Sequence, residues 1–215
     1  MLHHGDESAE HLVRRLESFS DIVIAFSLAE LTLNLSIPAR VEELWHRPLW
    51  LSAYVWTFAV VSSLWYSHHR LFVRAFVPAK LAIFLNFVWL ATVGLLVYLM
   101  QVSTHLWSDE HATRTLYNMY FGLYGVNIAV TAALYLIGSS HRTSLDEAAR
   151  LDAARRAEAN GIAAATVFAS IAIAAYLPTT VFFWVVPSSI GVGFFFAWLW
   201  HAARKFGRPT AAAER

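Results

Sequence analysis

Long apolar runs, separated by shorter polar segments, dominate the chain. Each run is about 20 residues long, which is the length of a helix that crosses the hydrocarbon core of a bilayer. The runs show no strict alternation of apolar and polar residues, so they favour membrane helices over barrel strands. The pattern predicts an all-α membrane protein with six spans, at Phe19–Ile37, Leu49–Phe72, Leu81–Gln101, Leu116–Gly138, Gly161–Leu177 and Thr180–His201.

The connections between the last three spans carry further information. The fifth and sixth spans are joined by a short link around Pro178, which predicts a tight antiparallel hairpin. Residues 139–160, before the fifth span, are highly charged and rich in residues with high helix propensity. We expect this segment to extend a helix beyond the membrane.

The basic residues are distributed unequally between the two sides of the predicted bundle. If the N-terminus is cytoplasmic, most of the 16 Lys and Arg residues lie in inside segments, and only Arg40, Arg47 and Arg114 lie in outside loops. Cytoplasmic loops of membrane proteins carry this excess. Both termini should therefore be cytoplasmic. The chain divides into an N-terminal tail over 1–14, a membrane domain over 15–205 and a C-terminal tail over 206–215.

Composition narrows the possible classes of protein. Hydrophobic residues make up 58% of the chain and charged residues only 14%, with a mean hydropathy of +0.49, whereas soluble domains carry about 25% charged residues. A net charge of +1 gives no reason to expect nucleic acid as a partner. The absence of cysteine excludes disulfides and thiolate nucleophiles. The polar, acidic first ten residues do not have the pattern of a cleavable signal peptide.

The first span is unusually polar for a membrane helix, because it contains Asp21, Glu30 and Asn34 together with several Ser and Thr residues. Such a helix is expected inside a bundle or beside an aqueous pathway. A helical wheel places four apolar residues within about 60° of one another. We call this set the apolar stripe, and its members are Ile22, Phe26, Ala29 and Leu33.

Asp21 lies roughly 120° from the centre of the apolar stripe, and Glu30 and Asn34 lie on the opposite flank. The pattern leaves open whether the stripe packs on neighbouring helices or lines a pathway.

The second span ends in a polar tract that contains Trp65, His68 and His69. These side chains should lie at a depth similar to that of Asp21, and we expect a buried hydrogen-bond network there. Single asparagines in the third and fourth spans, Asn86 and Asn127, are expected to form hydrogen bonds between helices. No metal site is predicted, because adjacent histidines on a helix point about 100° apart and the chain lacks an HExxH motif.

A short motif at the start of the first span resembles a known signature. Arg15, followed after three residues by Phe19, Ser20 and Asp21, matches RxxxFSD. This signature occurs in prokaryotic relatives of the lysosomal potassium channel transmembrane protein 175. The second-span tract and Asn86 are similar to that family as well. The motifs cover about the first 100 residues, and the remainder of the chain resembles the family only in topology.

The resemblance implies a homotetrameric channel for K⁺, and in part for Na⁺ or other monovalent cations, in a bacterial inner membrane. The first helices of four subunits would line the pore, and the chain has no TVGYG-type filter. The family's pore positions correspond to Phe26, Ala29 and Leu33, where bulky apolar side chains could gate by dewetting. No cofactor is implied. The signature residues would instead hold the first helix against the next two, and this structural set is Arg15, Phe19, Ser20, Asp21, Trp65, His68, His69 and Asn86.

Several positions depart from the family pattern. Relatives usually have Ile or Leu at the position of Phe26, Thr or Leu at Ala29, an apolar residue at Glu30 and Gly at Ile22. Four Glu30 side chains near a pore could attract cations, or they could be buried against a neighbouring helix.

An alternative function is a secondary transporter or proton-coupled carrier, in which Asp21, Glu30, His68 and His69 would relay protons. An intramembrane enzyme is disfavoured, because the chain contains no GxSxG or paired metal-ligand motif.

Overall fold

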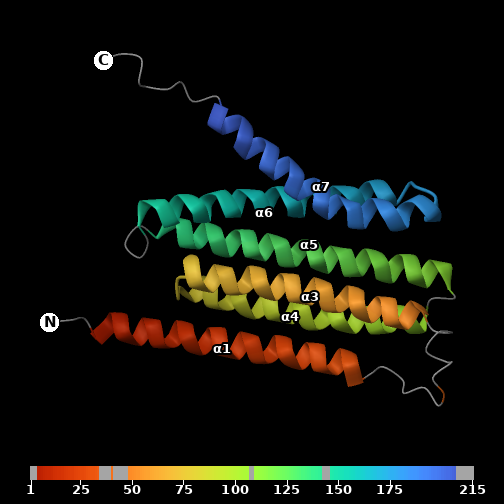
Figure 1. Ribbon diagram of the computed structural model, residues 1–215, viewed down its shortest axis with the longest axis horizontal. Helices are drawn as coiled ribbons and strands as arrows, with labels where there is room; N and C mark the ends of the chain where they lie inside the picture. Colours follow the sequence, from red (N-terminus) through yellow and green to blue (C-terminus); the bar gives the residue numbers. More distant parts are fainter. Residues whose placement is uncertain (1–3, 34–39, 41–47, 107–108, 142–145, 207–215) are drawn as a thin grey trace.

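The computed structural model describes residues 4–33, 40, 48–106, 109–141 and 146–206. Helices connected by turns make up the secondary structure of these residues, which confirms the predicted all-α class (Figure 1). The six helices are α1 His4–Leu33, α3 Pro48–Arg74, α4 Lys80–His105, α5 Glu110–Ser140, α6 Glu147–Ala174 and α7 Thr179–Phe206.

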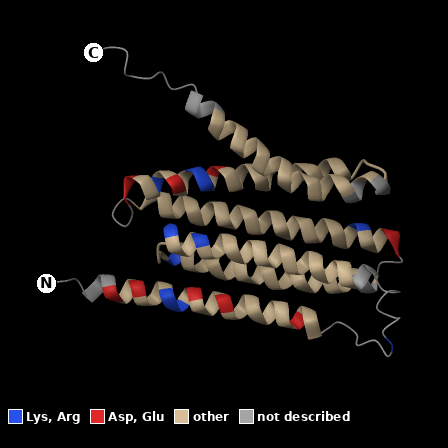
Figure 2. Cartoon of the chain, viewed as in Figure 1, with Lys and Arg blue, Asp and Glu red and all other residues tan. Residues whose placement is uncertain are grey.

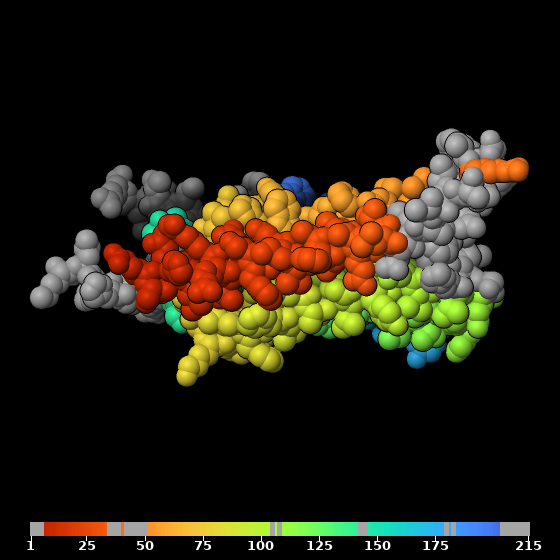
Figure 3. Space-filling view, turned by 90° about the horizontal axis from the view of Figure 1, so that it is seen from below, coloured from red at the N-terminus to blue at the C-terminus, as the bar shows by residue number. Residues whose placement is uncertain are grey.

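The helices lie side by side in an order that nearly follows the sequence. Helix α1 forms one side of the bundle and packs on α3 and α4 (Figure 1). A view from below shows α1 lying along the boundary between these two helices (Figure 3). Helix α5 packs on α4 on one side and on α6 on the other, and α6 pairs with α7 at the far side. Helix α1 is therefore separated from the α6–α7 hairpin by the rest of the bundle.

The helix boundaries extend several of the predicted spans. Helix α1 begins at His4, so residues 4–14 of the predicted tail continue the first span as helix. Helix α6 begins at Glu147, after the N-cap Asp146, whose carboxylate accepts a hydrogen bond from the Ala149 N–H. The charged segment therefore does extend the fifth helix, as expected. Residues 34–37 of the first span lie outside the described residues.

Four helices, α4 to α7, are long and apolar enough to cross a membrane when the described residues are considered. Helices α1 and α3 are not among these four, and the apolar part of α1 contains the acidic residues Glu17, Asp21 and Glu30. Charged side chains are concentrated on α1 and at the helix ends (Figure 2). We therefore propose, rather than observe, that all six helices span the membrane. For α1 and α3 this requires hydrogen-bond partners for their polar side chains.

Hydrogen bonds between side chains join α4 to α5 inside the apolar core. The Trp89 indole N–H donates to Thr131 Oγ1 at 3.0 Å, and Asn127 Nδ2 donates to Thr92 Oγ1 at 2.7 Å. All four side chains are buried. The hydrogen bond between helices that was predicted for Asn127 is present. Such bonds satisfy polar groups that neither lipid nor an apolar core can satisfy.

The α6–α7 hairpin depends on small residues and on an arginine of α5. A Cβ added at Gly193 of α7 would lie 2.8 Å from Ala163 Cα of α6, so the two helices approach closely. The Arg114 guanidinium donates to the carbonyls of Ala174 and Leu177, at 2.6 and 3.1 Å, where α6 ends. Pro187 lies inside α7, and the C-terminal part of α7 bends away from the bundle (Figure 1).

Gly138 provides a test of the packing between α5 and the end of α3. A Cβ at this position would lie 2.1 Å from the Ala75 carbonyl oxygen, whereas a Cβ at Gly94 in α4 would meet nothing within 4 Å. We expect Gly138→Ala to lower the free energy of unfolding by about 1–3 kcal/mol, because backbone must move. Gly94→Ala should be neutral or stabilising by up to about 1 kcal/mol. Tryptophan fluorescence during thermal unfolding in detergent measures both, and equal shifts would contradict this packing.

Candidate functional site on the first helix

Helix α1 has two opposite apolar faces with different surroundings. The residues of one face, spaced three or four apart, are buried against α3 and α4. The apolar stripe is exposed along its whole length, with exposed fractions of 55% for Ile22, 73% for Phe26 and 84% for Leu33. At 100° per residue the two faces lie roughly 150° apart. The buried face consists of Leu16, Ser20, Ile24, Ser27 and Leu31.

The exposure of the apolar stripe resolves one question that the sequence left open. Among the described residues, the helices that pack on α1 contact its other face and leave the stripe exposed. A row of exposed apolar side chains must instead face lipid, a second protein surface or a pathway between subunits.

A buried hydrogen-bond chain connects α1, α3 and α4 through three fully buried side chains. His68 donates from Nε2 to Asn86 Oδ1 at 2.7 Å, and Asn86 donates from Nδ2 to Ser20 Oγ at 3.3 Å. Ser20 in turn donates to the Leu16 carbonyl at 2.8 Å. This direction of donation requires the proton on His68 Nε2, a tautomer assigned from the network. One asparagine thus bonds both neighbouring helices.

Two further contacts join α1 to α3 at the same end of the bundle. The Trp65 indole N–H donates to Asp21 Oδ1 at 2.8 Å. His69 Nδ1 lies 3.1 Å from Glu17 Oε1. The Trp65 and His69 rings stack with centroids 5.9 Å apart. Together these contacts place a pair of carboxylates of α1 against a pair of aromatic side chains of α3.

Most residues of the predicted structural set therefore lie together. Ser20, Asp21, Trp65, His68, His69 and Asn86 form the contacts described above. Phe19 lies beside them, with its ring edge-on to Phe87 of α4 at 6.0 Å. Arg15 is exposed on α1 and takes no part in these contacts among the described residues. Glu30 is also exposed, and Asn34 lies outside the described residues.

The contact between Glu17 and His69 was not predicted. A signal was available, since Glu17 precedes Asp21 by four residues and His69 follows Trp65 by four. Residues four apart lie on the same face of a helix. Two such pairs on adjacent helices can make two neighbouring contacts, which here are Asp21 with Trp65 and Glu17 with His69.

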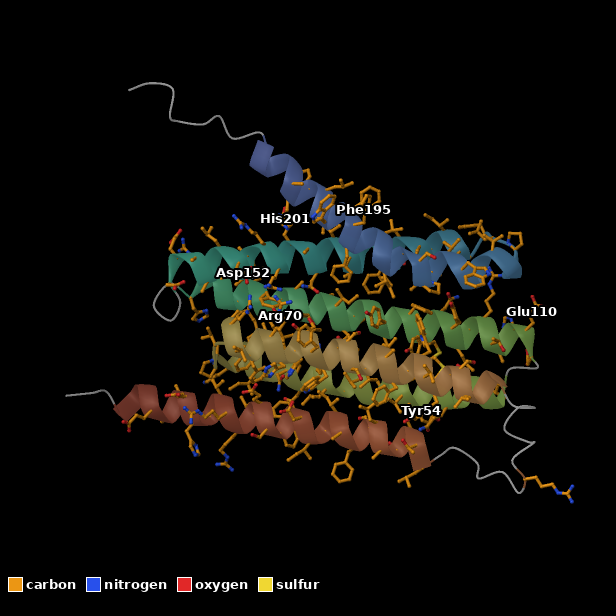
Figure 4. The ribbon with its side chains drawn as sticks, in the orientation of Figure 1. Tyr54, Arg70, Glu110, Asp152, Phe195 and His201 are labelled. Carbon is orange, nitrogen blue, oxygen red and sulfur yellow. The ribbon has the colours of Figure 1, made fainter. Side chains whose placement is uncertain are left out.

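The other end of α1 is held differently. There the Thr32 Oγ1 lies 3.5 Å from the Tyr54 hydroxyl of α3, the long limit for a hydrogen bond. Tyr54 is labelled near this end in Figure 4. Apolar packing of Ile24 and Leu31 supplies further contact. Within the described residues, no group of three or more His, Asp or Glu side chains could hold a metal ion.

Comparison with known proteins shows a similarity between the first part of the chain and a known family. Residues 15–96 match the family model described as the endosomal/lysosomal potassium channel TMEM175. The matched segment contains the signature, the hydrogen-bond chain and most of α4. Over this segment the chain is similar to the TMEM175 channels. The resemblance inferred from RxxxFSD is thereby confirmed, and proteins of this family are ion channels, not enzymes.

Relatives of known name and structure agree with the family match. A potassium channel of Marivirga tractuosa is 30% identical over 112 residues, which cover 52% of this chain and 42% of that protein. The match thus spans less than half the length of this curated relative. The crystal structure of a variant of the potassium channel MtTMEM175, in complex with a nanobody–MBP fusion, gives a TM-score of 0.66 at 18% identity, over 87% of this chain and 93% of that chain.

A second solved structure is the lysosomal potassium-selective channel TMEM175 homologue from Chamaesiphon minutus. It gives a TM-score of 0.62 at 20% identity and covers 90% of this chain and 98% of that chain. At these identities the two solved structures establish the fold that the chain shares with TMEM175 homologues.

Removal of Asn86 tests the hydrogen-bond chain. Asn86→Ala leaves His68 and Ser20 buried without their shared partner, so we expect the free energy of unfolding to fall by about 1–3 kcal/mol. Trp65→Phe removes the N–H that donates to Asp21 and part of the ring that stacks on His69, but at a half-exposed position, and its effect should be smaller. Thermal unfolding of both variants in detergent measures the difference. A larger loss for Trp65→Phe would show that the buried chain is not the main anchor.

Proposed function

We propose that this chain is the subunit of a homotetrameric cation channel for K⁺, selective or weakly selective over Na⁺, in a bacterial inner membrane. Helix α1 of each subunit would face the pore with the apolar stripe. The observation that carries this proposal is the position of that stripe, exposed along α1 and opposite the face that packs on α3 and α4. The family match and the name of the Marivirga relative support K⁺ as the permeant ion.

The position of α1 at the side of the bundle supports an oligomer. A pathway along an exposed helix needs other protein surfaces to enclose it, and rotational symmetry supplies them when identical stripes meet at a common axis. The six helices would all span the membrane, with both termini cytoplasmic. In that arrangement α1 loses its contact with lipid, which explains how a helix with low hydropathy is accommodated.

The apolar stripe would form a hydrophobic constriction rather than a binding filter. Four Phe26 rings at the same depth narrow the path and favour its dewetting, and Ala29 leaves a wider section beyond them. Since no carbonyl-lined TVGYG filter is present, selectivity would come from weaker polar and electrostatic effects. Glu30, on the flank of the stripe, would raise the local concentration of cations.

The hydrogen-bond chain would hold α1 in position without contacting permeant ions. Ser20, His68 and Asn86 are buried within the subunit, and Asp21 is bonded to Trp65 of α3. This placement argues against the alternative of a proton-coupled carrier, because a relay through His68 would need access to water.

Ion flux into liposomes tests the proposal. Purified protein is reconstituted in vesicles with K⁺ inside and Na⁺ or choline outside, and empty vesicles serve as the control. We expect K⁺ to leave down its gradient without a proton gradient or added substrate, and Na⁺ to enter more slowly. Flux that requires a proton gradient would support the carrier instead. A folded protein that crosslinks only to a dimer would contradict the tetramer.

The role of Phe26 can be separated from a general effect of removing an exposed ring. We expect Phe26→Ala to increase K⁺ flux several-fold, because four smaller side chains widen the constriction. Phe195→Ala is the matched control, since Phe195 is 56% exposed but lies on α7, at the far side of the bundle from α1 (Figure 4). Unchanged flux in a well-folded Phe26→Ala tetramer, or an equal increase for Phe195→Ala, would contradict the proposed constriction.

A further inference from the structure

A cavity of about 530 Å³ lies where α3 ends and α6 begins, far from the apolar stripe. Arg74 and Val73 contribute from the last turn of α3, and Asp146 and Asp152 contribute from the start of α6. Tyr135 of α5 also lines the cavity, and its side chain is only 2% exposed. Asp152 and Arg70 are labelled at this end of the bundle in Figure 4.

Asp152 of the cavity pairs more closely with Arg156 than with Arg74. Asp152 Oδ2 accepts a hydrogen bond from Arg156 Nε at 2.7 Å, whereas Arg74 Nη1 lies 3.6 Å from the same oxygen. Arg156 therefore holds Asp152, and Arg74 is paired only loosely. A guanidinium has five N–H donors, so Arg74 keeps donors for an incoming oxyanion. Its side chain is 52% exposed.

Asp146 supplies the opposite charge at the other side of the cavity. One carboxylate oxygen accepts the Ala149 N–H at 2.6 Å and caps α6. A carboxylate has about four acceptor positions, so this cap leaves capacity for a second donor. The cavity thus offers a cation and an anion that can each accept a further partner.

The cavity also lies at the expected level of lipid headgroups. Val73 and Arg74 directly follow the predicted span Leu49–Phe72, and Tyr135 lies three residues before the end of Leu116–Gly138. Asp146 and Asp152 belong to the charged segment before the predicted fifth span, and the packing of α6 brings them to the ends of these two spans. The walls between the charged groups are apolar and include Ala75, Ala153 and the exposed Val73. An apolar wall beside charged groups at this depth fits a molecule with a polar head and acyl chains.

We propose that this cavity binds the headgroup of an aminophospholipid, with the phosphate diester at Arg74 and the primary ammonium at Asp146. A purely anionic headgroup would meet the two carboxylates, and a purely cationic ligand would meet Arg74. A zwitterion with both charges complements both sides. A primary ammonium has three N–H donors for Asp146 and the Tyr135 hydroxyl, whereas the trimethylammonium of choline has none. This inference does not depend on the proposed channel function.

Native mass spectrometry of the detergent-solubilised full chain tests the proposal with three lipids of identical acyl chains. These are phosphatidylethanolamine, phosphatidylcholine and phosphatidylglycerol. We expect phosphatidylethanolamine to bind at least about tenfold more tightly than the other two, because losing a hydrogen bond to a charged group has at least this effect. Equal binding of the ethanolamine and choline lipids would overturn the assignment, and so would preference for phosphatidylglycerol.

Asp146→Asn is the decisive variant, since asparagine caps a helix about as well as aspartate but carries no charge. We expect it to weaken binding of phosphatidylethanolamine about tenfold and to leave phosphatidylcholine unchanged. Asp109→Asn is the matched control, because Asp109 caps α5 by accepting the Ala112 N–H at 3.0 Å, away from this cavity. Equal losses for the two variants, or none for Asp146→Asn, would overturn the site.

A competition experiment distinguishes the lipid from its soluble headgroup. Glycero-3-phosphoethanolamine carries the same phosphate diester and primary ammonium without acyl chains. We expect it to displace the lipid only at much higher concentration, since it cannot use the apolar wall. Displacement at concentrations equal to that of the lipid would overturn the assignment to a membrane lipid.

Discussion

The arrangement of this protein depends on one constraint, which is that a polar group removed from water must find a hydrogen-bond partner. Helix α1 carries more polar side chains than an isolated membrane helix can tolerate, and α3 ends in a tract of histidines. Asn86 resolves part of both problems, because it accepts from His68 on one side and donates to Ser20 on the other. This amide, the contacts of Asp21 and Glu17 with α3, and the apolar packing of Ile24 and Leu31 together position α1 and set the direction of its exposed face.

The sequence was sufficient to predict the helical class, because long apolar runs are local signals. Among the described residues, helices lie near the predicted spans, and most members of the predicted structural set come into contact. That this set holds the first helix in place stays a prediction. The start of α1 at His4 was not predicted, since a helix can continue into polar residues without any change in hydropathy that marks its end. The pairing of Glu17 with His69 was missed for another reason, because it depends on how two helices are rotated against each other.

The direction of the apolar stripe also required the structure. A helical wheel gives the angle between two faces of a helix but not which face its neighbours cover. Contacts from α3 and α4 to Ser20, Ile24 and Leu31 decide that question. The cavity at the end of α3 could not be inferred at all, because Arg74, Tyr135 and Asp146 are brought together only by the packing of three helices.

The two ends of α1 are fastened by different kinds of interaction. Directional hydrogen bonds join α1 to its neighbours between Glu17 and Asp21, while apolar packing and a long hydrogen bond contribute at the end near Leu33. Apolar contacts have no preferred direction, so they permit small rotations that hydrogen bonds resist. A tilt of α1 would therefore be expected to pivot near its polar end, at Glu17 and Asp21. Leu33 lies roughly 16 Å along the axis from Ile22, and any tilt about that pivot displaces it furthest.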